Sequence, residues 1–483
     1  MAALAAGDID KASSALDALR KAAGDIENVQ FLSAELLEKQ QRYDAAGAQF
    51  EKLLATNPKL VRAKMAYAQL LLLQGRAADA SRQLTDVLQI EPANATALSA
   101  LLQIELAEGH AAVAVTLVEA ALKTAPNDQT LILTLSDLYI AAGTPAKSIA
   151  LLDSSVKPDA KPIPTLLLAR ARAQLALKQN VQALETYRKV AELLPKNTEI
   201  VREIAVLQVD AKDFDGARRT LRDGLITQPA DPNLLHAMVG VAYLGHGEAA
   251  ALDEIKRLQA DPANKTAALT LLPDFDISTR NYQKAAQEYT SLLQTAPSSA
   301  MLMMATRAYI QAGEPAQARD LLHLWLSKQP RDMEATRALA SLDISNKQLS
   351  DALPLLEAVV QRQPNDAGSL NNLAWIYAQQ NNPKALETAR RAFDLVASPQ
   401  SADTLGWILA THGDAQNALP LLLQAAAAMP TDPSVQFHLA TALNATGKKA
   451  DAIKALTPLA ARTAPFDEQP AARQLLADLQ AGK

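Results

Sequence analysis

Histidine and carboxylate side chains are the groups in this sequence best suited to metal binding or proton transfer, but their spacing builds no site. The six histidines are His110, His236, His246, His323, His412 and His438. No two of them stand four residues apart, and the zinc motif His-Glu-x-x-His is missing. Cysteine is also absent, which removes thiolate metal sites and thiol nucleophiles. Because nothing marks a pair of carboxylates for acid–base work, we expect no catalytic residue and no metal site.

The glycines between Gly240 and Gly247 mimic the spacing of a phosphate-binding loop without its chemistry. The stretch lacks the Lys-Ser/Thr pair that would reach phosphate and magnesium, and no strand precedes it. A Gly-x-Ser-x-Gly nucleophile elbow is absent as well. The sequence therefore predicts a protein that is not an enzyme and that binds no cofactor.

The charge balance gives no reason to expect a nucleic acid or a membrane as partner. The chain has 47 basic and 52 acidic residues, for a net charge of −5, whereas nucleic-acid binding normally shows as a clustered basic face. No window approaches the ~18 uncharged apolar residues of a membrane span, so direct membrane insertion is not expected. Hydrophobic residues make up 49% of the chain but aromatic residues only 4%, a mixture that suits close helix packing.

Regularly spaced prolines divide the chain into repeated helical units. These units must position any functional side chain. Most intervals between them are 33 to 35 residues, and the 69-residue interval after Pro126 spans two repeats. Within a unit, an apolar period of 3.6 breaks at a turn such as Gln74-Gly75, resumes, and stops at the proline. Each unit therefore reads as helix, turn, helix. The prolines are Pro58, Pro92, Pro126, Pro195, Pro229, Pro262, Pro297, Pro330, Pro364, Pro399 and Pro430.

Small residues recur at one position in each of the two helices, where we expect the helices to approach most closely. The first-helix position holds Ala34, Ala68, Ala171, Ala205, Ala340, Ala374, Gly406 and Ala440. The second-helix position holds Ala46, Ala80, Ala114, Ala183, Ala217, Ala285, Ala318, Ala352, Ala418 and Ala452. A bulky residue four positions after the second one, such as Phe50 or Leu422, is expected to fill the space between repeats.

The segments Asn372-Leu373-Ala374-Trp375, Thr404-Leu405-Gly406-Trp407 and Leu439-Ala440 resemble the tetratricopeptide repeat (TPR). The resemblance covers nearly the whole chain. It implies an all-α fold, a right-handed superhelical solenoid of about 13 helix-turn-helix units.

A narrower resemblance rests on residues 370–377, 402–409 and 438–440. They are similar to the C-terminal part of large bacterial TPR proteins that accompany exopolysaccharide secretion and the PEP-CTERM protein-sorting system. This implies the periplasm or cell envelope if Met1 is not the natural start, whereas a complete chain would be cytoplasmic.

We expect four segments along the chain. They are a partial repeat at 1–26, an N-terminal array at 27–262, a C-terminal array at 263–465 and a capping helix at 466–483. Three places break the rhythm: a proline-rich connector at 157–164, a kinked or shortened helix near Pro273, and a shortened unit at 381–399.

In TPR proteins the first helices line a concave wall, and the resemblance places partner contacts there. The partner-binding residues implied in this way are Met303, Met304, Arg307, Arg337, Asn371, Asn372, Trp375 and His438, with further wall positions at Arg62, Met65, Gln69, Thr130, Leu133, Asp137, Arg172, Arg202 and Glu334. Asn372 matches an asparagine that some TPR superhelices use to hold a peptide backbone, although a solvated helix position is the alternative. For Met303, Met304 and Trp375 the alternative is packing in the core.

These observations predict a scaffold that binds other proteins or peptides and assembles a multiprotein complex, with bacterial exopolysaccharide export or envelope protein sorting as the implied setting. One alternative is an RNA-binding helical-repeat protein, which the acidic balance disfavours. The other is an accessory array of an enzyme complex. The sequence indicates no oligomeric state.

Overall fold

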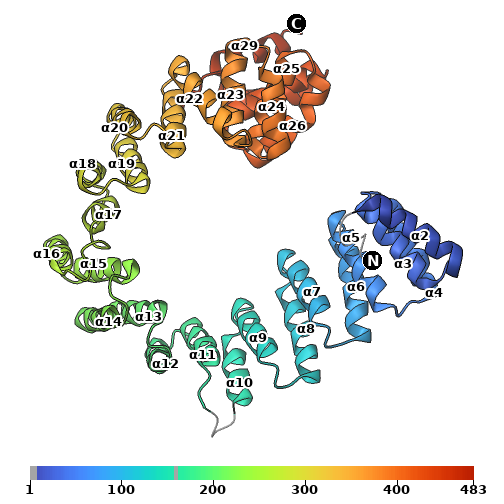
Figure 1. Cartoon of the computed structure of the whole chain (residues 1–483), viewed down its shortest axis with the longest axis horizontal. Helices are drawn as coiled ribbons and strands as arrows, with labels where there is room; N and C mark the ends of the chain where they lie inside the picture. Colours follow the sequence, from blue (N-terminus) through green and yellow to red (C-terminus); the bar gives the residue numbers. More distant parts are fainter. Residues whose placement is uncertain (1–7, 157–160, 483) are drawn as a thin grey trace. The chain divides into compact units, whose positions relative to one another are not determined.

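The protein is all-α in the computed structural model, which describes residues 8–156 and 161–482. These residues form 28 helices and no strand, and consecutive helices pair as antiparallel hairpins (Figure 1). Thirteen hairpins follow one another, which confirms the predicted number of units and the helical-repeat solenoid. We call the two helices of each hairpin its first and second helix. The chain divides into two compact units, Met1–Lys265 and Thr266–Lys483.

Unit 1 holds seven hairpins, preceded by a single helix, α2 (Ile9–Ala23), which lies in the segment 1–26 where a partial repeat was predicted. Its first helices are α3 (Glu27–Lys39), α5 (Val61–Leu73), α7 (Ala95–Ala107), α9 (Gln129–Ala141), α11 (Pro164–Ala176), α13 (Thr198–Asp210) and α15 (Pro232–His246). Its second helices are α4 (Tyr43–Thr56), α6 (Ala77–Ile90), α8 (Ala111–Thr124), α10 (Pro145–Ser155), α12 (Asn180–Leu193), α14 (Phe214–Thr227) and α16 (Glu248–Ala260). The predicted connector at 157–164 lies partly outside the described residues.

Unit 2 holds six hairpins and a last helix, α29 (Gln469–Gln480). Its first helices are α17 (Leu271–Ser278), α19 (Ser299–Gln311), α21 (Met333–Ser345), α23 (Ala367–Gln379), α25 (Pro399–Thr411) and α27 (Pro433–Ala445). Its second helices are α18 (Tyr282–Thr295), α20 (Pro315–Lys328), α22 (Leu349–Arg362), α24 (Ala385–Leu395), α26 (Ala415–Ala428) and α28 (Lys449–Ala460). With only 8 residues, α17 is the shortened helix expected at Pro273, and α24 is short as expected, with 11 residues.

The core of each hairpin is built from the small residues that the sequence singled out. Ala80 and Ala217 on second helices, and Ala171 and Ala374 on first helices, are fully buried. At Gly406 of α25, an added Cβ would stand 2.7 Å from Cγ of Leu422 on α26. The two helices of a hairpin therefore touch at these positions, which leaves no room for a larger side chain.

The hairpin turn repeats one backbone conformation with different residues. A residue with positive φ follows the first helix in all thirteen described hairpins, and in seven of them it is a glycine, as at Gly75 (φ 73°). Elsewhere a side chain is present in the same conformation, as at Lys178 (φ 59°) and Lys347 (φ 61°). Each such residue is strained by roughly 1–2 kcal/mol, so the turn is fixed by the packing of the hairpin and not by glycine alone.

A series of buried polar side chains interrupts the apolar helix interfaces. They occupy one position of the first helix, three residues after the small-residue position, and are Glu105, Gln174, Gln208, Asp276 and Asp343. We call them the buried polar series. They are not recognisable in the sequence, because each has the pattern of one more polar residue on an amphipathic helix.

Each member of the buried polar series bonds to a second helix. Gln174 and Gln208 accept hydrogen bonds from Thr186 and Thr220 of their own hairpins, both at 2.8 Å. Asp276 accepts a hydrogen bond from Lys284 of its own hairpin at 3.2 Å. Glu105 and Asp343 instead bond to the second helix of the preceding hairpin, from Ser81 at 2.8 Å and Arg319 at 2.6 Å. The pair is Gln–Thr in two successive hairpins, whereas the other three pairs differ in residue type and charge.

The last helix packs against the end of unit 2. Leu479 of α29 is buried, and Leu475 and Leu476 lie half-buried on the same hydrophobic cluster. The segment that leads into α29 is held by Asp467, which forms an ion pair with Lys347 at 2.8 Å, and by Glu468, which accepts a hydrogen bond from Ser434 at 2.8 Å. In the described parts of the chain, no helix is both long and apolar enough to cross a membrane.

Candidate functional site

The predicted partner-binding residues of unit 2 lie on its first helices but do not form one surface. Met303 and Met304 of α19 are half-buried against the core that includes Trp325, whereas Arg307 is exposed. Trp375 of α23 is half-buried against the neighbouring cluster. Met303, Met304 and Trp375 therefore pack partly in the core, as the alternative interpretation expected, and the rest of each side chain is exposed.

Arg337 of α21 is already engaged within the protein. Its guanidinium donates hydrogen bonds to Gln363 at 2.8 Å and to Asp366 at 2.9 Å. Asp366 is itself the N-cap of α23, where it accepts from the backbone N–H of Ser369. Arg337 thus ties two successive first helices together, and a partner carboxylate would have to compete with Asp366.

Asn371 and Asn372 are the two predicted residues that the structure brings together at a pocket. The pocket has a volume of about 420 Å³ and is completed by Gln400 and Ser401 at the start of α25. The Oδ1 atom of Asn371 is buried there without a hydrogen-bond partner among the described residues. The pocket offers amide groups that both donate and accept, and it contains no charged side chain.

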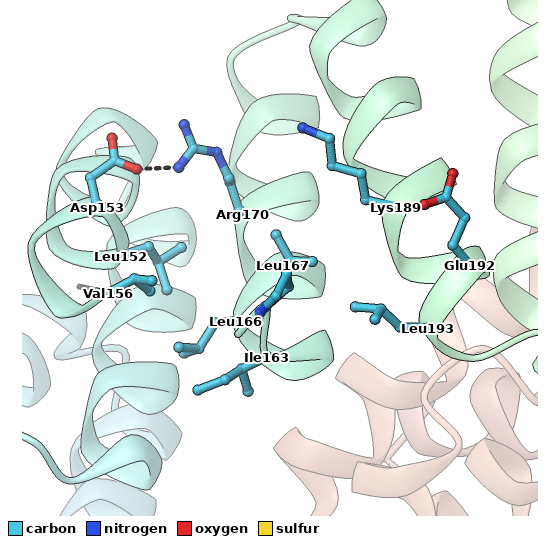
Figure 2. Close-up of a pocket in the computed structure, with 11 residues that line it drawn as sticks. Leu152, Asp153, Val156, Ile163, Leu166, Leu167, Arg170, Lys189, Glu192 and Leu193 are labelled. Atoms are coloured by element: carbon cyan, nitrogen blue, oxygen red, sulfur yellow. Dashed lines mark hydrogen bonds and ion pairs between the residues drawn. The ribbon is translucent and has the colours of Figure 1, made fainter. Parts of the chain in front are cut away.

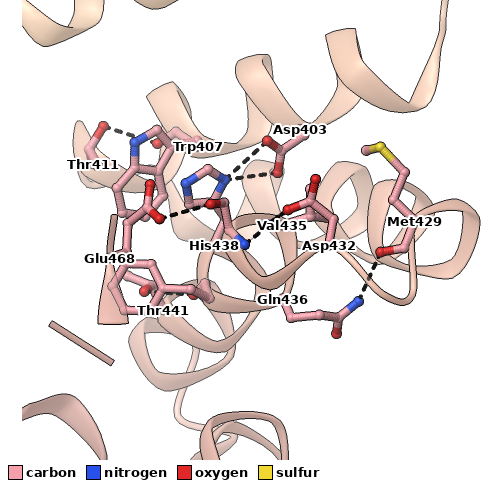
Figure 3. A network of polar contacts seen from close by, with 12 residues as sticks. Asp403, Trp407, Thr411, Met429, Asp432, Val435, Gln436, His438, Thr441 and Glu468 are labelled. Carbon is pink, nitrogen blue, oxygen red and sulfur yellow. Dashed lines mark hydrogen bonds and ion pairs between the residues drawn. The ribbon is translucent and has the colours of Figure 1, made fainter. Parts of the chain in front are cut away.

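His438 requires a correction, because the structure places it inside the wall. Its side chain is only 8% exposed, and Nδ1 lies 2.9 Å from a carboxylate oxygen of Asp403 on α25. The imidazole stacks on Trp407, with ring centroids 4.2 Å apart (Figure 3). We expected this residue to face a partner, but a stacked and hydrogen-bonded ring between α25 and α27 stabilises their packing instead.

Several wall positions of unit 1 are paired with one another. Arg172 of α11 forms an ion pair with Asp137 of α9 at 3.7 Å. Arg62 of α5 stacks over the ring of Phe31, 3.6 Å from its centroid. These contacts link successive first helices, so they add to the stability of the wall whether or not a ligand binds there.

A groove between α13 and α15 exposes apolar side chains on the first helices of unit 1. Its volume is about 480 Å³, and its lining includes Val206 and Val209 of α13 and Gly240 and Leu244 of α15. Val206 is 51% exposed and Leu244 is 63% exposed, although both are large apolar side chains. An apolar surface left open in this way, with polar residues around it, is typical of an interaction site.

Gly240 leaves part of the groove wall without a side chain. α13 and α15 are in contact through their buried faces, while Gly240 presents no side chain toward the groove. An added Cβ at Gly240 would meet no atom within 4 Å. The glycine that the sequence analysis considered only as part of a failed phosphate loop therefore opens the space between Val206 and Leu244.

Polar residues stand at both ends of this groove. Arg202, which the sequence placed on the wall, lies near one end with Asn233 and His236, and Asp210 lies at the other. His236 Nδ1 is within 2.6 Å of the carbonyl oxygen of Pro232. Arg202 and Asp210 are exposed and form no hydrogen bond or ion pair through their side chains within residues 8–156 and 161–482.

A second cleft in unit 1 lies among α10, α11 and α12 (Figure 2). Its volume is about 460 Å³, and Leu152, Leu166 and Leu193 contribute to an apolar lining. Asp153 and Arg170 form an ion pair at its rim. This pair neutralises two of the charges that line the cleft, and Lys189 and Glu192 supply the other two.

Three potential metal ligands come together near the α7–α8 turn. Atoms of Glu105, Glu108 and His110 lie within 4.8 Å of one another. Glu105 is already occupied, since it accepts from Ser81 and lies 3.1 Å from Nδ1 of His110. The group is a surface extension of the buried polar series, and we assign no metal to it.

Two family models match the chain, and both are described as "Tetratricopeptide repeat". One matches residues 37–104, 105–173, 174–239 and 277–342, together more than half of the chain. The other matches residues 1–61, 337–402 and 404–468. No curated protein matches the chain. Among solved structures, the "Structure of Naa15/Naa10 bound to HypK-THB" is similar at 16% identity and a TM-score of 0.44, over 99% of this chain and 76% of that chain. At this TM-score the likeness supports no conclusion about function.

Proposed function

The chain belongs to the tetratricopeptide repeat family, and on that premise we propose that it is a scaffold that binds other proteins or peptides through the groove between α13 and α15. TPR proteins are in general non-catalytic, and the described residues bring together no nucleophile, base and orienting group. The observation that carries the proposal is the exposure of Val206 and Leu244 on facing first helices.

Burial of these side chains by a ligand would favour binding. Covering the exposed parts of a valine and a leucine contributes roughly 1–3 kcal/mol in total. Both residues stand on regular helices, so little conformational freedom is lost when a ligand is bound. Gly240 leaves space for an apolar side chain of the ligand between them. The groove thus combines a rigid frame with an apolar floor.

A selection from a random peptide library, followed by fluorescence anisotropy with the selected peptides, tests this proposal. The double variant Val206→Asp with Leu244→Asp should weaken binding at least about tenfold, because it places two charges on the apolar floor. The matched control is Val181→Asp with Ile226→Asp on α12 and α14, where the original side chains are 70% and 73% exposed outside the groove. Equal affinities of the two double variants would exclude this groove as the binding surface.

The setting in a cell is a separate proposal. We propose bacterial exopolysaccharide export or envelope protein sorting on the strength of the sequence resemblance of residues 370–377, 402–409 and 438–440 alone. Deletion of the gene from its host should then reduce secreted polysaccharide or the sorting of envelope proteins, and unchanged levels of both would contradict it.

We also propose that nucleic acid is not the ligand. The groove contains one cationic side chain with a permanent charge, Arg202, whereas a nucleic-acid site needs several along a backbone. A salt-dependent mobility shift with single-stranded RNA would overturn this part of the proposal.

A further inference from the structure

The groove between α13 and α15 carries opposite charges at its two ends. Arg202 and Asp210 belong to the same helix and are eight residues apart, which corresponds to about 12 Å along the helix axis. They are the permanently charged side chains among the residues that line the groove. Neither forms a side-chain hydrogen bond or ion pair with another described residue. The charges at both ends are therefore available to a ligand.

The end that contains Arg202 is suited to a carboxylate. Asn233 of α15 lines the same end of the groove, and its side-chain amide nitrogen can donate hydrogen bonds. The guanidinium supplies the positive charge and a planar set of N–H groups that matches a carboxylate. At the opposite end, Asp210 stands beside the apolar side chain of Leu244, and it would attract an ammonium or guanidinium group.

The distance between the charged ends matches an extended peptide. An extended chain advances about 3.3–3.6 Å per residue, so residues four positions apart are separated by roughly 13–14 Å. The residue midway between them would lie over Val206 and Gly240, at the apolar centre of the groove. A helical ligand would need seven or eight residues to span the same length, and only part of its surface would reach the floor.

We propose that the groove binds an extended protein segment that has an acidic residue, an aliphatic residue two positions on, and a basic residue two positions further. The acidic side chain pairs with Arg202, the aliphatic side chain lies between Val206 and Leu244, and the basic side chain pairs with Asp210. A segment with the reverse order binds in the opposite chain direction and makes the same contacts. This inference rests on the proposed function, because it specifies the partner of the same groove.

The experiment uses the full chain and three fluorescent peptides with acetylated and amidated ends, so that terminal charges play no part. The peptides carry Glu-Ser-Leu-Ser-Lys, Glu-Ser-Leu-Ser-Glu or Lys-Ser-Leu-Ser-Lys between neutral flanks. The unsubstituted protein should prefer the first peptide by roughly three- to tenfold, as expected for exposed charge pairs. Asp210→Lys should shift the preference to the peptide with two acidic residues, and Arg202→Glu to the peptide with two basic residues.

Arg222→Glu and Asp223→Lys serve as matched controls, because both residues are exposed on α14 and do not line the groove. Neither should change the order of the three affinities. If the peptides bind with equal affinity, and Val206→Asp with Leu244→Asp weakens them all, the charge assignment is wrong while the proposed function stands. If no peptide binds to the unsubstituted protein or to either charge variant, the proposed pattern of acidic, aliphatic and basic residues is wrong, and the library selection alone decides whether the groove binds peptides. Peptide preferences that follow the charge at residues 202 and 210 would establish the assignment.

Discussion

Two glycines inside helices, Gly240 of α15 and Gly406 of α25, should respond to the same substitution with opposite signs. Alanine at a helix interior is favoured over glycine by roughly 0.5–1 kcal/mol, because glycine loses more backbone freedom on folding. At Gly240 the new methyl group would point into open space, with no atom within 4 Å. Gly240→Ala should therefore raise the free energy of unfolding by about the full 0.5–1 kcal/mol.

At Gly406 the same methyl group has no room. It would stand 2.7 Å from Cγ and 3.0 Å from Cδ2 of Leu422, and 3.3 Å from the carbonyl oxygen of Ala418. Leu422 is fully buried, so the overlap is relieved only if α25 and α26 move apart. Overpacking of this kind costs roughly 1–3 kcal/mol. After subtraction of the gain in helix propensity, Gly406→Ala should lower the free energy of unfolding by about 1 kcal/mol.

Urea unfolding followed by two probes separates these effects. The three tryptophans, Trp325, Trp375 and Trp407, all belong to unit 2, so fluorescence reports on that unit while circular dichroism reports on both. Gly406→Ala should lower the fluorescence midpoint. Gly240→Ala should leave the fluorescence midpoint unchanged. It should shift the part of the dichroism transition that belongs to unit 1 to a higher urea concentration. A fluorescence midpoint that stays constant or rises in Gly406→Ala would refute the inference that contact between α25 and α26 is tight.

Three further changes test the packing and the buried charges. Ala217→Leu should cost roughly 1–3 kcal/mol in urea melts, because Ala217 is fully buried at a helix crossing. Burial, together with the negative charge of Asp276, raises the pKa of Glu288 to about 7. Its stabilising contribution is therefore complete below the unfolded value of about 4.5 and is lost as the pH rises through 7. Glu288→Gln should remove this dependence from thermal melts at pH 5 and pH 8. Arg319→Met should cost about 3–5 kcal/mol by leaving Asp343 buried without its partner, and a second change, Asp343→Leu, should restore most of that loss in the same fluorescence assay.

The repeated architecture was predictable because each unit carries its own signals. Ala80 and Ala217 recur at the same distance from a turn, and a residue that must be small at a helix crossing is visible in one chain without any relative. The short helix at Pro273 was also predictable, since proline lacks the N–H that a helix interior needs. The segment boundary predicted after residue 262 stays a prediction about folding.

The candidate site was less predictable because it depends on neighbours from other units. Arg202 could be placed on the wall by its position in the repeat. Val206 and Leu244 were missed, since an apolar residue on an amphipathic helix is normally read as part of the core. His438 was placed on the wall in the same way as Arg202, but Trp407 and Asp403 of the preceding first helix enclose it. Whether a wall position is open or covered therefore depends on the neighbouring first helix. That helix belongs to another repeat, so the sequence of one repeat does not show the outcome.

The buried polar series has a consequence for how the chain finds its own partners during folding. The hairpins share their apolar positions, so a first helix could dock on the second helix of the wrong unit with little loss of apolar contact, a known failure of tandem repeats. Such an exchange would, for example, bring Asp343 against Thr220 and leave its buried carboxylate without a counter-charge. Each mismatch carries a penalty of several kcal/mol. The series thus disfavours docking on the wrong unit at the five hairpins that carry it, most strongly where the buried residue is a carboxylate, at Glu105, Asp276 and Asp343.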